Sequence, residues 1–116
     1  MGYINSMNAT LSALAEPNRL HIVELLRDGP LPVGDIAEKL HLQQPQVSKH
    51  LRVLHDAGLV GVQPAANRRI YMLETRPLQE LDAWLGSFRR VWEDRFDQLD
   101  DYLQELQSKP KQPDGD

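Results

Sequence analysis

The fold of this chain is decided by the stretch QPQVSKHLRVLHDAG at residues 44–58. Three apolar side chains in it recur at helical spacing and form one stripe: Val47, Leu51 and Leu54. Pro45 suits the first turn of a helix, where its missing N–H breaks no hydrogen bond. Gly58 tolerates the left-handed conformation that commonly ends a helix. The stretch therefore predicts a helix over about residues 44–57.

A shorter helix is predicted just before this one, over residues 32–40. Its apolar face consists of Ile36, Ala37 and Leu40. His41 and Leu42 then form a brief turn. Two short helices joined in this way form a helix-turn-helix, in which residues 33–40 support the helix at residues 44–57.

The sequence pattern changes period after Gly58. Residues 59–63 and 69–73 are short runs of β-prone residues, and residues 64–67 between them are typical of a turn. They predict a β-hairpin over about residues 59–73 with arginines at its tip. The predicted fold is therefore mainly α with a small β-hairpin, a winged helix-turn-helix.

The outward face of the predicted 44–57 helix has the chemistry of DNA recognition. An α-helix fits the major groove, where glutamine can pair with adenine and arginine with guanine. A basic hairpin tip suits the DNA backbone or the minor groove. The predicted DNA-binding residues are Gln44, Gln46, Ser48, Lys49, Arg52, Asn67, Arg68 and Arg69. Asp56 repels phosphate, so we expect it to lie at the end of the helix that is far from the duplex.

The charge distribution favours double-stranded DNA as the partner, although the chain of 116 residues has a formal net charge of −4. Residues 41–76 carry five basic and two acidic side chains, and the segments on either side are net acidic. A polyanion responds to this local field rather than to the total charge. The chain has no cysteine and so no disulfide, and no apolar run approaches the ~20 residues of a membrane span. We therefore expect a cytoplasmic protein.

The C-terminal third predicts a long dimerisation helix over about residues 77–107. Its apolar residues follow steps of three and four, with one stutter near Trp92, as in a coiled-coil seam. A helix over residues 78–106 would be about 44 Å long at ~1.5 Å per residue. Because a chain of this size cannot cover such a helix alone, we expect a homodimer. The alternative is a helix that bends at Gly86 and folds back on its own domain.

The predicted dimer interface also includes a first helix over about residues 8–15. The interface residues are Leu11, Leu14, Leu85, Phe88, Trp92, Phe96, Leu99 and Leu103. The expected organisation is an N-terminal arm (1–7), one winged-helix domain with its dimerisation helices (8–107) and a disordered tail (108–116).

The sequence resembles the ArsR-type winged helix-turn-helix transcriptional repressors over about residues 8–107. The resemblance lies in Ala15–Leu20 with Ile22 and Leu25-Leu26, in Val33–Ala37, and in Gln44–Leu51 with Leu54 and Ala57–Val60. It implies a homodimer built on the first and last helices. It also implies a repressor that binds an inverted repeat in a promoter.

The departures from the family pattern concern metals and the helix cap. Pro32-Val33-Gly34 stands where arsenic and cadmium sensors of the family carry Cys-Val-Cys, and residues 77–116 contain no histidine for a zinc or nickel site. The last helix resembles metal-independent members, so we expect no metal and no cofactor. Its aromatic residues are expected to pack in the interface; the alternative is a small-molecule pocket, with the effector unknown. Gln43 replaces the usual serine or threonine and is a weak N-cap, so the helix start is expected to fray without DNA.

The two function classes that compete with a transcriptional regulator are a protein-binding module and an enzyme. A winged helix that contacts proteins, with weak or lost DNA binding, is the alternative that the overall acidity leaves open. An enzyme is not expected, because the sequence has no nucleophile elbow, Gly-rich phosphate loop or metal-ligand spacing. Ser48 and His50 are not a catalytic dyad, since side chains two apart on a helix diverge.

Overall fold

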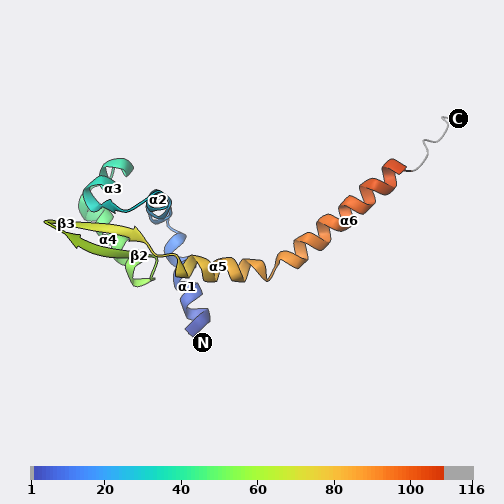
Figure 1. The fold of residues 1–116 in the computed structure, drawn as a ribbon, viewed down its shortest axis with the longest axis horizontal. Coiled ribbons are helices and arrows are strands. Elements are labelled where there is room, and N and C mark those ends of the chain that lie inside the picture. The colour runs from blue at the N-terminus through green and yellow to red at the C-terminus, as the bar shows by residue number, and fades with distance from the viewer. Residues whose placement is uncertain (1, 109–116) are drawn as a thin grey trace. The chain divides into compact units, whose positions relative to one another are not determined.

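The computed structural model describes residues 2–108, with side chains from Ser6 onward, and divides into two compact units that meet between Asp82 and Ala83 (Figure 1). The first unit contains α1 (Gly2–Leu14), α2 (Pro17–Leu26), β1 (Leu31–Pro32), α3 (Val33–Leu40), α4 (Gln44–Asp56), β2 (Val60–Ala65), β3 (Arg68–Leu73) and the first turns of α5 (Arg76–Gly86). The second unit contains the end of α5 and α6 (Arg89–Ser108). The predicted winged helix-turn-helix is confirmed by α3, α4 and the β2–β3 hairpin.

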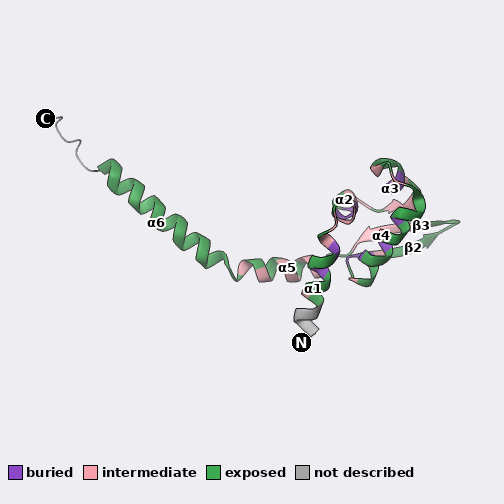
Figure 2. Ribbon diagram, turned by 180° about the vertical axis from the view of Figure 1, so that it is seen from behind, coloured by how far each residue is buried: buried purple, intermediate pink, exposed green. Residues whose placement is uncertain are grey.

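The core of the first unit is built from the end of α1, with Ala13, and from α2, α3, α4 and the start of β2. The stripe predicted on α4 is buried, with Val47 and Leu54 fully inaccessible to solvent. Ile22 of α2, Ile36 of α3 and Leu59 before β2 meet it from the other elements, and the buried positions are purple in Figure 2. The opposite face of α4 is thereby held toward solvent.

The sheet has three antiparallel strands in the order β1-β3-β2. Two differences from the predicted hairpin follow from its register. The turn is shorter than residues 64–67, because Pro64 and Ala65 still pair with β3; Pro64 is tolerated since β2 is an edge strand. The two-residue β1, which pairs Leu31 with Tyr71, was not predicted because so short a strand has no periodicity.

The first helix begins earlier than predicted. α1 starts at Gly2 instead of near Asn8, so the expected N-terminal arm is helical from its second residue. No proline interrupts residues 2–14, and the Thr10 hydroxyl donates to the Ser6 carbonyl at 3.1 Å, one turn back. The first break is therefore the one at Glu16-Pro17.

The prediction of one continuous helix over residues 77–107 is wrong. α5 ends at Gly86 and α6 begins at Arg89. Glycine has a low helix propensity, and the Ser87 hydroxyl donates to the Trp84 carbonyl at 2.6 Å, which stabilises the break. Every residue of α6 is exposed (Figure 2).

Within the described part of the chain, no helix combines the length and apolarity needed to cross a membrane. Residues 109–116 of the expected tail lie outside the described residues.

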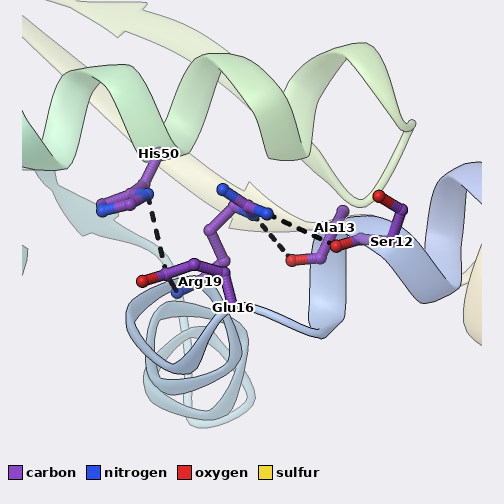
Figure 3. A network of polar contacts seen from close by, with 5 residues as sticks. All are labelled: Ser12, Ala13, Glu16, Arg19 and His50. Atoms are coloured by element: carbon purple, nitrogen blue, oxygen red, sulfur yellow. Dashed lines mark hydrogen bonds and ion pairs between the residues drawn. The ribbon is translucent and has the colours of Figure 1, made fainter.

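A polar corner holds α1, α2 and α4 together (Figure 3). Glu16 caps α2 by accepting from the backbone N–H of Arg19 at 2.9 Å. The Arg19 side chain turns back and donates to the Ala13 carbonyl at 2.7 Å, near the end of α1. His50 Nδ1 of α4 lies 3.8 Å from the Glu16 carboxylate. These contacts connect the start of α2 both to α1 and to α4.

This corner predicts a pH dependence of stability. The Arg19 backbone N–H lowers the pKa of Glu16 below its ordinary value of 4.5, and the nearby His50 acts in the same direction. Because the folded-state pKa is depressed, the stabilisation is complete well above pH 4.5 and is lost as the pH falls through the folded value. Glu16→Gln is therefore expected to destabilise the protein near neutral pH and to cost much less near pH 3. Urea unfolding at both pH values measures this, with Glu24→Gln on the same helix as control; an equal cost at both pH values would contradict it.

Candidate nucleic-acid interface

The residues predicted on the helix lie on the solvent side of α4. Gln44, Gln46, Ser48, Lys49 and Arg52 are all exposed, and the buried stripe lies on the opposite side. The first turn carries no acidic residue, so the positive end of the helix dipole faces solvent without a neutralising carboxylate. Asp56 is the last residue of α4 and lines neither of the hollows described below.

The hairpin presents its arginines at the tip. Ala66 has a φ of 57°, a left-handed conformation that lets two residues reverse the chain. Arg68 and Arg69 follow at once as the first residues of β3, and both are exposed together with Asn67. The tip therefore offers two guanidinium groups and an amide to a ligand.

Two hollows lie between the helices and the hairpin. One, of about 430 Å³, is lined by Val33, Ser48, Leu51, Arg52, His55, Val62, Arg69 and Tyr71. The other, of about 370 Å³, is lined by Pro32, Val33, Gly34, Gln44, Asn67, Arg68 and Arg69. The structure thus brings together six of the eight predicted DNA-binding residues, all except Gln46 and Lys49. None of the described residues that line either hollow is acidic.

Gln46 has a structural role that sequence reasoning missed. Its side-chain Oε1 accepts a hydrogen bond from the backbone N–H of Gln43 at 3.1 Å. This is one half of a capping box, in which the third helical residue caps the residue before the helix. The cap of α4 therefore comes from Gln46 rather than from a serine or threonine at position 43. Because of this bond, removing the side chain would change both the helix start and any base contact.

Gln46→Glu separates these two roles. Glutamate keeps the oxygen that accepts from Gln43 and is favourable in the first turn of a helix. Its negative charge would face DNA phosphates, so we expect an unchanged melting temperature and a loss of DNA affinity of about tenfold or more at ~0.1 M salt. Thermal unfolding and DNA titration by fluorescence anisotropy measure the two effects. Gln79→Glu, the same change at an exposed position in the first turn of α5, is the control; DNA affinity that is unchanged by Gln46→Glu would contradict a DNA-facing Gln46.

Comparison with known proteins identifies the family. The family described as "Bacterial regulatory protein, arsR family" matches residues 16–62, the segment from the α2 cap to β2. The chain is 42% identical over 88 residues to HTH-type transcriptional regulator Rv2034 of Mycobacterium tuberculosis, covering 76% of this chain and 82% of that protein. This protein belongs to the ArsR family.

Further relatives of this ArsR-family protein agree with the assignment. Transcriptional repressor SdpR of Bacillus subtilis is 33% identical over 82 residues, which cover 71% of this chain and 91% of that protein. A crystal structure of the ArsR family transcriptional regulator RHA00566 superposes with a TM-score of 0.69 at 28% identity, covering 77% of this chain and 92% of the other. These findings confirm the predicted fold and the prediction of a transcriptional regulator rather than an enzyme.

The histidines of this ArsR-family protein are dispersed. His50 lies at the Glu16 corner, whereas His55 lines the larger hollow. Among the described residues, no three histidine, aspartate or glutamate side chains gather in a group that could hold a metal ion. His55 was not among the predicted DNA-binding residues. The signal in the sequence was its spacing, since it follows Ser48 and Arg52 at positions i+7 and i+3 on the same helix.

The residues predicted for dimerisation fall into two groups. Leu14 packs partly buried against the core of its own unit, while Leu11 of α1 is exposed. The residues after α5 form an apolar row at steps of four, four, three and four that is exposed throughout: Phe88, Trp92, Phe96, Leu99 and Leu103. Leu85 near the end of α5 is also exposed, and Phe88 packs edge-on against Trp84 with ring centroids 5.1 Å apart.

Proposed function

We propose that this protein is a homodimeric transcriptional repressor that binds an inverted-repeat operator through the major groove. The observation that carries the proposal is the surface shared by α4 and the hairpin. Six side chains suited to bases or phosphates line two adjoining hollows there, and none of the described lining residues is acidic. The family membership adds that relatives with this fold are transcriptional regulators.

In this proposal the first half of α4 is the part of the recognition helix that contacts the bases. Its N-terminal turns carry Gln46 and Lys49 on the exposed face and outside both hollows, where a recognition helix contacts base edges. Arg68 and Arg69 at the hairpin tip provide contacts to the backbone or the minor groove. The helix supplies sequence preference, and the hairpin supplies affinity that does not depend on sequence.

The proposed dimer contact is the apolar row of α6. Phe96 is 65% exposed and Leu99 52% exposed, values that are unusual for large apolar side chains in so regular a row. From Trp92 onward the row repeats at steps of four and three, the spacing of a helix-to-helix seam. A second copy of this chain carries the same seam. A symmetric dimer presents two identical recognition helices, and such a dimer fits an inverted repeat.

In this proposal the cytoplasmic protein represses transcription by occupying a promoter. The relative SdpR is named as a transcriptional repressor. The test is titration of the protein into labelled DNA from the region upstream of its own gene, with random DNA as control. We expect specific binding that weakens by about 10³–10⁵ between 50 and 200 mM salt, as for six to ten phosphate contacts. A folded dimer that binds neither DNA at low salt would overturn the proposal and favour a protein-binding module.

A further inference from the structure

We propose that His55 is a further DNA-binding residue, which contacts a backbone phosphate in the hollow between α4 and the hairpin. The inference rests on the proposed function, and it adds the place on the protein where part of the DNA backbone binds. It assigns a role to an exposed histidine that was not among the predicted DNA-binding residues.

One wall of this hollow is a single row along α4. Ser48, Arg52 and His55 stand at positions i, i+4 and i+7, so they project from the same side of the helix. All three are exposed and all three line the hollow. They offer a hydroxyl, a guanidinium group and a ring N–H, each of which can donate to a phosphate oxygen.

The other wall is one face of the hairpin. Val62 pairs with Tyr71, and Pro64 pairs with Arg69. Because side chains alternate along a strand, Arg69 and Tyr71 share one face of β3, and both line the hollow. A guanidinium group therefore lies on each wall, with the apolar side chains of Leu51 and Val62 also among the lining.

The chemistry of the lining indicates an anion, and the shape of the surface favours a strand over a compact ligand. The described lining residues include two arginines and no carboxylate; Asp56, the neighbour of His55, is not among them. The second hollow shares Val33 and Arg69 with the first. The two hollows therefore share part of their walls, and their linings together extend from His55 of α4 to Asn67 and Arg68 at the hairpin tip. A sugar–phosphate backbone can extend along such a surface, whereas a small free anion would occupy one end.

The first experiment compares two variants of His55 in the full-length protein. His55→Ala removes the ring N–H and is expected to weaken binding about tenfold, to operator and random DNA alike, because phosphate contacts do not depend on sequence. His55→Gln keeps an N–H donor and should restore most of the affinity. His21→Ala, at an exposed position on α2 outside both hollows, is the matched control and should bind like the wild type.

The outcomes separate this inference from the proposed function. If the wild type binds its operator specifically and His55→Ala binds within twofold of it, the inference fails and the function stands. If His55→Ala loses affinity only for the operator, His55 reads bases and the backbone assignment is wrong.

The second experiment follows the His55 ring by NMR during titration with duplex DNA and with inorganic phosphate alone. We expect a saturable shift of the ring signals with DNA, and no saturation with millimolar phosphate. Saturation by phosphate alone would show a site for a free anion and would overturn the proposal.

Discussion

Leu99→Asp is expected to convert the proposed dimer to a monomer at micromolar concentration and to weaken operator binding by about 10²–10⁴-fold. Leu99 lies in the middle of the exposed row on α6. In a symmetric dimer the substitution would place two unpaired carboxylates in an apolar contact, which is strongly unfavourable. A dimer gains its affinity by binding two half-sites at once, and a monomer loses that gain. Sedimentation velocity and DNA titration measure the two effects.

The matched control for this prediction is Gln98→Asp. It adds the same charge one residue earlier on α6, about 100° around the helix from Leu99 and off the apolar row. It should remain dimeric and should bind the operator like the wild type, apart from a small electrostatic cost. A dimer that survives Leu99→Asp, with the core of the first unit still cooperatively folded, would show that the α6 row is not the contact between subunits.

The double variant Arg68→Ala, Arg69→Ala is expected to lose about a hundredfold in affinity per hairpin, or about 10⁴-fold for a dimer with two hairpins, on any DNA sequence. Two charge-assisted hydrogen bonds of about 1.5 kcal/mol each correspond to a tenfold loss apiece. Each lost phosphate contact also reduces the salt dependence by about one counterion. A dimer has two hairpins, so the slope should become shallower by about four. DNA titrations at several salt concentrations measure both quantities.

The control for the hairpin variant removes the same charge elsewhere. Arg27 and Lys39 are exposed at the ends of α2 and α3, outside both hollows. Their double alanine variant should keep nearly full affinity and slope, because a local field, not the total charge, attracts DNA. Equal losses in the two double variants would show that the hairpin tip makes no direct contact.

Much of the candidate DNA-binding surface could be predicted from periodicity. The buried stripe of α4 was evident from the spacing of Val47, Leu51 and Leu54, and once that face is buried the opposite face must be exposed. The same reasoning placed Arg68 and Arg69 at a hairpin tip between two β-prone runs. These features are local, because a few adjacent residues determine them.

Other features depended on contacts between distant residues. β1 exists because Leu31 meets Tyr71 forty residues later, and no local pattern marks so short a strand. The position of His55 beside Arg69 depends on how the hairpin packs on α4. The capping contact of Gln46 could not be predicted from Gln43 alone, because the oxygen that accepts from the Gln43 backbone N–H lies three residues later.

The break between α5 and α6 also shows which features follow from sequence periodicity and which do not. The heptad-like spacing of apolar residues predicted a helical row, and the row is present, but Gly86 and the Ser87 bond to Trp84 interrupt the helix. The sequence alone was enough to predict the helix-turn-helix, the hairpin, the buried and exposed faces of α4, and the family. Only the tertiary structure decided which exposed side chains meet across the hollows, because such neighbours come from elements that are separate in sequence and are brought together by the packing of the core.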